Sequence, residues 1–309
     1  FLTFHSHHTM LTTQLLFTFI LLTTGLLVSV VSSASNPYEQ GPLGVTTYDV
    51  NKGEKGLVYD IEVTVPTEPG KYPIIILVTA FAGNVPVSAY TEFMNQVTSH
   101  GFIVVGIYTF PSLPFDKVAF NTEKVMEWCR DNIDAYTQQN TGNAVVADFT
   151  RLAIGGHSAG GKMAIRLLQD GCQGIKAAIL LDPVDGEDPW GILPYYVIHP
   201  PQMVNFTIPT LVLGSGYGPV PLNGMFPACA PKTKNFPRFF NAMHCPIWSL
   251  NATEWGHGDF LDPFWLGPDK LICSSNPNKD ADYSAYRAFM AGAVTAFSQG
   301  KINDDCSAL

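Results

Sequence analysis

Positive charge is scarce in this sequence: 17 lysines and arginines stand against 26 aspartates and glutamates in 309 residues, for a formal net charge of −9. A nucleic-acid partner requires basic surface that displaces the counterions of the phosphates, so the composition argues against one. An acidic surface is compatible with a neutral or apolar small-molecule substrate. The sequence also lacks internal repeats and low-complexity linkers, and its 46% of hydrophobic residues suit one large domain with a substantial core.

Complete cofactor signatures are lacking too. The run LGSGYG at 213–218 has the glycines of a dinucleotide-binding loop, but Pro219 and Pro221 stand where the helix of that motif begins. The adjacent histidine and cysteine at 244–245 have no second, suitably spaced pair that would complete a zinc site. We therefore expect neither a metal nor an organic cofactor.

The amino-terminal segment has the pattern of a secretory leader. Residues 15–31 are almost wholly apolar, and a Ser-Ser-Ala run follows that ends at Ala34. We predict that residues 1–34 are a cleaved signal peptide with Met10 as the initiator, and that residues 35–309 form a single catalytic domain with no stable membrane span. The alternative is an uncleaved anchor, because no lysine or arginine precedes the apolar run and its 17 residues could cross a bilayer.

Cysteine usage agrees with export. All six cysteines follow the proposed cleavage site, and in an oxidising compartment they suggest as many as three disulfides among Cys129, Cys172, Cys229, Cys245, Cys273 and Cys306. The sequons at Asn205 and Asn251 would be glycosylated on the same route. We therefore expect a protein that is secreted or resides in the lumen of the secretory pathway.

The spacing of apolar residues predicts an α/β fold with a mostly parallel sheet. Alternation at 45–50 and 57–66 indicates an antiparallel hairpin. Uninterrupted apolar runs, typical of strands buried on both faces, follow at 74–78, 103–107, 152–154, 177–181 and 211–213. Helical patterns lie at 90–100, 116–138, 159–169 and 281–297. This order predicts helices on both faces of the sheet.

The run GHSAG at 156–160 places a serine between glycines, where a strand passes into a helix. This is the nucleophile elbow of α/β-hydrolases, in which the serine has a strained backbone and the glycines avoid collisions with the neighbouring strand and helix. The helix that begins at Ala159 offers free N–H groups to an oxyanion. We therefore predict Ser158 as the nucleophile of an α/β-hydrolase.

A serine nucleophile needs an acid and a histidine base, which follow it in the order Ser, Asp, His in this fold. Asp182 comes just after a buried strand, and Asp185 competes with it three residues later. Spacing alone leaves both open. His257, in the loop WGHGDFLD before the last helical pattern, is the predicted base.

The oxyanion hole is expected to take a second N–H from the loop VTAFAG, which follows the strand 74–78. Phe81 is the predicted donor in that loop, and Ala159 is the other. The small residues Ala80 and Ala82 would let the substrate carbonyl approach.

The substrate wall is expected in loops that leave the carboxyl ends of parallel strands. Candidate segments, rich in proline, glycine and aromatics, are 110–115, 186–209 and 214–237. We predict that Trp190, Ile192, Phe110 and Phe115 bind substrate by burying apolar area and by stacking on it. The alternative is that they cover the edge of the sheet.

Four runs together resemble the chlorophyllase family: GHSAGGK, LDPVDG, FPACAPK and WGHGDFLD occur in the family's order over roughly residues 42–300. The resemblance implies hydrolysis of the phytyl ester of chlorophyll to chlorophyllide and phytol through an acyl-enzyme. It also implies Ser158, Asp182 and His257 as nucleophile, acid and base, which favours Asp182 over Asp185.

Two positions depart from the family's usual pattern. Ala159 stands where the family has arginine, and the Thr-Ala pair at 79–80 stands where it has His-Gly. Both lie beside the predicted site, so the natural ester need not be chlorophyll. The alternatives are a secreted lipase or esterase that acts on other lipid or polymer esters, and a non-catalytic hydrolase fold used for binding.

Overall fold

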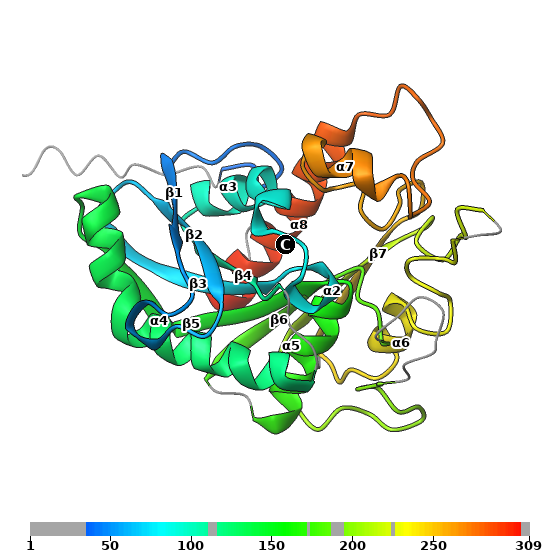
Figure 1. Ribbon diagram of the computed structural model, residues 1–309, viewed down its shortest axis with the longest axis horizontal. Helices are drawn as coiled ribbons and strands as arrows, with labels where there is room; N and C mark the ends of the chain where they lie inside the picture. The colour runs from blue at the N-terminus through cyan, green and yellow to red at the C-terminus, as the bar shows by residue number, and fades with distance from the viewer. Residues whose placement is uncertain (1–34, 111–115, 172–173, 187–194, 224–225, 304–309) are drawn as a thin grey trace, which may run out of the picture. The chain divides into compact units, whose positions relative to one another are not determined.

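The computed structural model describes residues 35–110, 116–171, 174–186, 195–223 and 226–303. The predicted leader, residues 1–34, lies outside these ranges. Residues Ser35–Leu309 form one compact unit, whose centre is an eight-stranded sheet with the order β1-β2-β4-β3-β5-β6-β7-β8 (Figure 1).

The strands are β1 (Val45–Val50), β2 (Asp60–Pro66), β3 (Gly70–Val78), β4 (Ile103–Tyr108), β5 (Val145–His157), β6 (Ile175–Leu181), β7 (Thr210–Ser215) and β8 (Ile247–Ala252). The helices are α2 (Ala80–Gly83), α3 (Thr91–Ser99), α4 (Asp116–Thr141), α5 (Ala159–Asp170), α6 (Phe236–Phe240), α7 (Pro263–Asp269) and α8 (Tyr283–Ile302), with short 3-10 helices η1 (Glu54–Gly56) and η2 (Val87–Ala89).

Strand pairing agrees with the expected architecture. β1 pairs with β2, and β2 with β4, in antiparallel fashion. The remaining neighbours, from β4–β3 to β7–β8, are parallel. The predicted amino-terminal hairpin and the mostly parallel sheet are both confirmed. Because β3, β5, β6 and β7 are parallel, the loops that follow them emerge at one edge of the sheet, which is where such folds build their sites.

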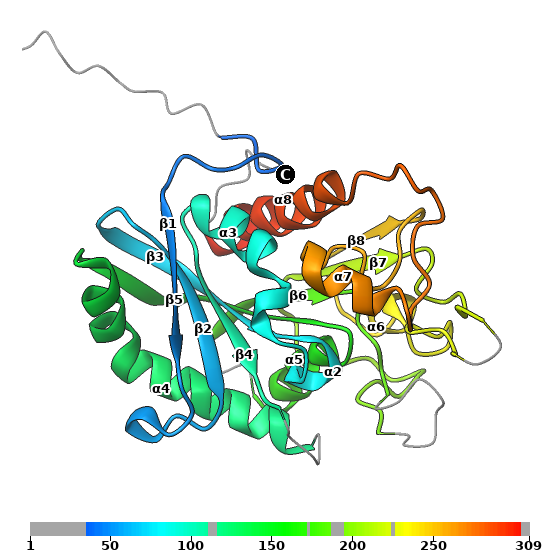
Figure 2. The ribbon, with the colours of Figure 1, turned by 45° about the horizontal axis from the view of Figure 1, so that its top comes forward.

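Helices cover both faces of the sheet, as Figure 2 shows: α4 and α5 lie on one face, α3 and α8 on the other. Each face has its own apolar core. Val125 and Met163 belong to the first core, and Phe93 and Met290 belong to the second. The strands between them are buried on both sides, which explains their uninterrupted apolar runs.

Several elements were not predicted by the spacing of apolar residues: the short helices α2 and α6, the 3-10 helices, and also β8 and α7. β8 is an edge strand whose residues are all exposed or only half-buried, so its sequence IWSLNA has no apolar run. α7 contains Pro263 and Pro268, and prolines normally signal the end of a helix. The predicted strand 152–154 is also much shorter than β5.

The sequence allowed as many as three disulfides, and the described residues contain one. One disulfide joins Cys229 to Cys273, whereas Cys129 and Cys245 carry none within the described residues. Cys129 belongs to α4 and faces the apolar core, and burial raises the pKa of its thiol to about 12. It therefore packs as a small apolar side chain rather than reacting as a thiolate. The remaining two cysteines, 172 and 306, lie outside the described ranges.

Membrane-spanning helices were sought throughout the described residues, and none is both long enough and apolar enough to cross a bilayer.

Candidate active site

Ser158 lies at a tight turn between β5 and α5, with φ 57° and ψ −127°. A Cβ atom on Gly156 would come within 2.3 Å of the Gly160 backbone, and one on Gly160 within 2.2 Å of the Val78 carbonyl oxygen. No side chain fits at such distances, so both glycines are required for strand β3, strand β5 and helix α5 to approach one another. The sequence GHSAG therefore forms the predicted elbow.

Asp182 follows β6 and is almost completely buried. Its Oδ2 accepts a hydrogen bond from His257 Nδ1 at 2.7 Å and from the Ser215 hydroxyl at 2.5 Å. Its Oδ1 accepts from the Ser215 backbone N–H at 3.1 Å. Because the carboxylate accepts, the proton of a neutral His257 ring lies on Nδ1 and its Nε2 is left with a lone pair.

Asp185 is equally buried but has other partners. Its carboxylate accepts from the backbone N–H groups of residues 197–198 at 2.8 and 3.2 Å and pairs with Arg238 Nε at 2.7 Å. The structure therefore brings Asp182, and not Asp185, to His257. Spacing could not separate the two, because both follow the same strand.

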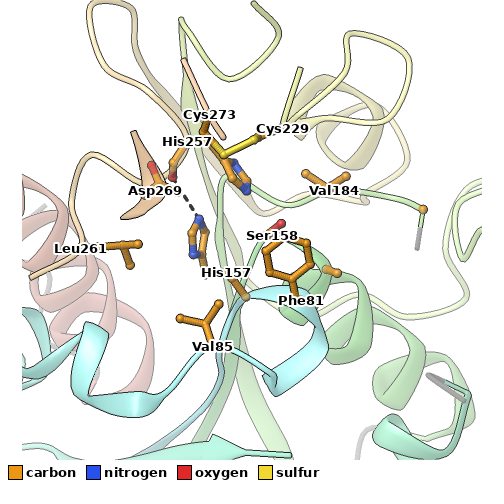
Figure 3. Close-up of a pocket in the computed structure, with 13 residues that line it drawn as sticks. Phe81, Val85, His157, Ser158, Val184, Cys229, His257, Leu261, Asp269 and Cys273 are labelled. Atoms are coloured by element: carbon orange, nitrogen blue, oxygen red, sulfur yellow. Dashed lines mark hydrogen bonds between the residues drawn. A yellow bond between two sulfur atoms is a disulfide. The ribbon is translucent and has the colours of Figure 1, made fainter. Parts of the chain in front are cut away.

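His257 lies in the loop between β8 and α7 and is buried. Asp259 holds this loop, since its carboxylate accepts from the backbone N–H groups of Gly256 at 2.6 Å and Asn276 at 2.8 Å. Ser158 and His257 line the same pocket (Figure 3). The three residues predicted from the sequence as nucleophile, acid and base thus gather at one edge of the sheet.

The turn after β3 holds the predicted oxyanion donor. Phe81 and Ala82 both have left-handed backbone, with φ of 50° and 53°. Such strain costs on the order of 1–3 kcal/mol per residue and tends to occur at functional sites. Phe81 and Ala159 both line the pocket beside Ser158, and the N–H of Ala159, as the first residue of α5, has no partner within that helix.

A buried histidine and a buried tyrosine, which sequence analysis did not assign to the site, connect its loops. His157 Nδ1 lies 2.8 Å from the Tyr90 hydroxyl, and His157 Nε2 lies 3.0 Å from the His257 carbonyl oxygen. Burial, and then the neighbouring His257, holds the pKa of His157 well below its usual value. Tyr90 begins a helical pattern, and nothing in its sequence context marks it.

Asp269 is a second carboxylate at the pocket that sequence analysis missed, because it lies at the end of the unpredicted α7. It lines the pocket near His257. Its Oδ2 is buried without a hydrogen-bond partner in the described part of the chain. Burial raises the pKa of Asp269 to about 6.

The apolar lining of the pocket differs from the predicted wall. Val85, Val184, Leu261 and the disulfide between Cys229 and Cys273 contribute to it. Phe110 is 60% exposed, stacks on Tyr108 with 6.3 Å between ring centroids, and is not among the described residues that line the pocket. The other predicted wall residues, Phe115, Trp190 and Ile192, lie outside the described ranges.

A serine elbow after β5, an aspartate after β6 and a histidine after β8, on a mostly parallel sheet, define the α/β-hydrolase fold. Sequence comparison then gives the family. The family model described as Chlorophyllase matches residues 33–309, so the chain belongs to the chlorophyllase family.

Curated relatives agree with this assignment. The chain is 29% identical over 259 residues to chlorophyllase-2 of Arabidopsis thaliana, a match that covers 79% of this chain and 77% of the relative. It is 28% identical over 282 residues to chlorophyllase type 0 of Chenopodium album, covering 85% and 76%. It is 30% identical over 256 residues to the chloroplastic chlorophyllase-1 of Citrus unshiu, covering 79% and 72%.

Proposed function

We propose that this protein is a serine carboxylic-ester hydrolase that cleaves the phytyl ester of chlorophyll to chlorophyllide and phytol. The observation that carries the proposal is the buried Asp182–His257 hydrogen bond at 2.7 Å, in the loops that meet at Ser158. Membership of the chlorophyllase family supports the substrate class. The apolar pocket around Ser158 supports an apolar ester.

The reaction has two steps. In the first, His257 Nε2 takes the proton of the Ser158 hydroxyl while Oγ attacks the ester carbonyl carbon. The oxyanion that forms accepts hydrogen bonds from the N–H groups of Phe81 and Ala159. Asp182 stabilises the imidazolium through Nδ1. When the tetrahedral intermediate collapses, the imidazolium returns its proton to the departing alcohol.

In the second step, water replaces the alcohol. His257 Nε2 takes a proton from the water, which attacks the acyl-serine carbonyl, and then returns a proton to Ser158 Oγ as the carboxylic acid leaves. Each proton that His257 accepts is returned within the same step. The protein's own side chains and amides therefore complete the hydrolysis.

The test is to incubate the mature protein with chlorophyll a, a phospholipid and a short p-nitrophenyl ester. We expect chlorophyllide and phytol from the first substrate, and release of p-nitrophenol from the last. If the phospholipid or the short ester is cleaved but chlorophyll a is not, the result favours the alternative, a lipase or esterase with a different natural substrate. Ala159 stands where the family usually has arginine, and this difference beside Ser158 is the reason to test other esters.

We also propose that the chain enters the secretory pathway. The side chains of Asn205 and Asn251 are exposed, as glycosylation requires, and the Cys229–Cys273 disulfide suits an oxidising compartment. Expression in secreting eukaryotic cells should give a mature chain that begins at Ser35 and shifts in mass after treatment with an N-glycosidase. Retention inside the cell with an unprocessed amino terminus would contradict this proposal.

A further inference from the structure

Two buried side chains, Tyr90 and His157, link the turn after β3 to the loop that carries His257. The Ala80 backbone N–H donates to Tyr90 Oη at 3.1 Å, and Tyr90 Oη lies 2.8 Å from His157 Nδ1. His157 Nε2 lies 3.0 Å from the His257 carbonyl oxygen. Tyr90 and His157 are 0% and 1% exposed, so water cannot replace a lost partner at either side chain.

The direction of every bond in this chain follows from the last acceptor. A carbonyl oxygen can only accept, so His157 Nε2 carries a proton. Burial keeps the ring neutral, so Nδ1 has a lone pair and accepts from the Tyr90 hydroxyl. The Tyr90 oxygen in turn accepts from Ala80 N–H. The chain therefore runs in one direction with every polar group satisfied.

The two ends of this chain are backbone groups beside the proposed catalytic atoms. Ala80 immediately precedes Phe81, the proposed oxyanion donor in a strained left-handed turn. At the other end the bond holds the backbone of His257, whose ring is held separately by Asp182. The Ala80 N–H is already engaged by Tyr90, which agrees with the next N–H, that of Phe81, as the proposed oxyanion donor.

We propose that Tyr90 and His157 are positioning residues that hold the oxyanion turn and the base loop at the separation the transition state requires. This inference rests on the proposed function of Ser158, Asp182 and His257. The competing explanation is core packing, since the Tyr90 ring also contacts Phe260 at a centroid distance of 5.9 Å. The two explanations differ in what the hydroxyl does: packing needs only the ring.

Tyr90→Phe keeps the ring and removes the hydroxyl. Active sites are counted by titration to completion with a fluorophosphonate. We expect kcat per active site on a short p-nitrophenyl ester to fall about tenfold to a hundredfold, with KM within about twofold of the wild-type value. A trifluoromethyl ketone that forms a tetrahedral oxyanion on Ser158 should bind more weakly by the same factor. Titration removes misfolded protein from the comparison, so a merely structural role would leave both values unchanged.

Tyr48→Phe is the matched control. Tyr48 is also buried, and its hydroxyl makes a 2.7 Å hydrogen bond to Thr137 of α4; neither residue lines the pocket. Its loss should lower stability without changing kcat per titrated site. A second pair of variants tests His157: glutamine can present an acceptor and a donor in place of the two ring nitrogens, whereas leucine presents neither. We expect His157→Gln to keep about tenfold more kcat than His157→Leu.

Wild-type kcat in Tyr90→Phe, or equal kcat in the two His157 variants, would overturn this inference. Should His157→Leu fail to fold, Tyr90→Phe decides alone. Ser158→Ala separates the inference from the proposed function: an inactive Ser158→Ala with an unchanged Tyr90→Phe refutes only the positioning role, whereas an active Ser158→Ala refutes the proposed nucleophile.

Discussion

Two buried aspartates that follow β6, three residues apart in the chain, have different hydrogen-bond partners. Asp182 bonds to His257 and Ser215 at the pocket. Asp185 bonds to Arg238 and to backbone N–H groups away from His257. Both carboxylates are buried and both are fully satisfied. Burial and charge therefore do not identify the catalytic acid; the identity of the partner does.

The residue after Asp185 is bound by another buried side chain. Lys162, fully buried in α5, donates from Nζ to the carbonyl oxygens of Gly186 at 3.1 Å and Tyr195 at 3.3 Å. These two residues flank the segment 187–194, which contains the predicted wall residues Trp190 and Ile192. The turn after β6 thus serves the proposed chemistry, while Lys162 binds the described residues on either side of a segment proposed to bind substrate.

The largest effect is expected at the nucleophile. Ser158→Ala should lower kcat by roughly 10³–10⁶-fold on every ester and leave the fold intact, because the attacking oxygen is removed. Hydrolysis of chlorophyll a and of a p-nitrophenyl ester, together with circular dichroism, measures both. Near wild-type turnover would refute Ser158 as the nucleophile and, with it, the proposed role of Asp182.

The two aspartates should separate in the next experiment. Asp182→Asn should lower kcat on the order of 10⁴-fold, because asparagine cannot stabilise the imidazolium. Asp185→Asn should leave kcat per titrated site within about tenfold, but lower the free energy of unfolding by about 3 kcal/mol, because Arg238 loses its buried partner. Steady-state kinetics and urea denaturation give the two values; the reverse ranking in kcat would assign the acid to Asp185.

Asp269 is a further carboxylate at the pocket, half-buried and with one buried oxygen that has no hydrogen-bond partner among the described residues. Its pKa is raised from 3.8 to about 6 by burial, so the unfolded chain loses this proton at lower pH than the folded chain. The favourable contribution is therefore present below about pH 4 and is lost as pH rises through about 6, at a cost of about 2–3 kcal/mol.

Asp269→Asn should therefore remove this loss, so that urea denaturation at pH 4 and at pH 8 shows a smaller difference than in the wild type. Asp170→Asn, which changes a half-exposed surface carboxylate paired with Arg166, is the matched control and should leave the pH dependence unchanged. An identical pH dependence in Asp269→Asn and wild type would contradict the raised pKa.

The smallest effect is expected at the predicted wall residues Trp190 and Ile192. Trp190→Ala combined with Ile192→Ala should raise KM for chlorophyll about tenfold, because apolar area contributes roughly 25 cal/mol per Å² to binding. A short p-nitrophenyl ester reaches only the pocket around Ser158, so its kinetics should not change. Equal losses on both substrates would make the segment structural, and no loss on either would direct attention to residues 110–115.

Much of the fold and part of the site could be predicted because their signals are local. Strands buried on both faces need uninterrupted apolar runs, and the tight turn at Ser158 admits only glycine at Gly156 and Gly160. β8 and α7 escaped prediction because an edge strand has little to bury and because Pro263 and Pro268 resemble helix breakers. Asp269 was missed together with α7.

The sequence by itself determined the class of fold, the elbow and the serine, since each depends on residues adjacent in the chain. Spacing left the choice between Asp182 and Asp185 open, the family resemblance favoured Asp182, and the tertiary structure places Asp182 at His257. Only the tertiary structure decided that Cys229 pairs with Cys273 and that Tyr90 and His157 connect two loops 177 residues apart, from Ala80 to His257. These contacts form between loops that meet only after β3, β5, β6 and β8 have paired in one sheet. A hydrogen bond depends on distance and direction in space, and neither can be read from spacing along the chain.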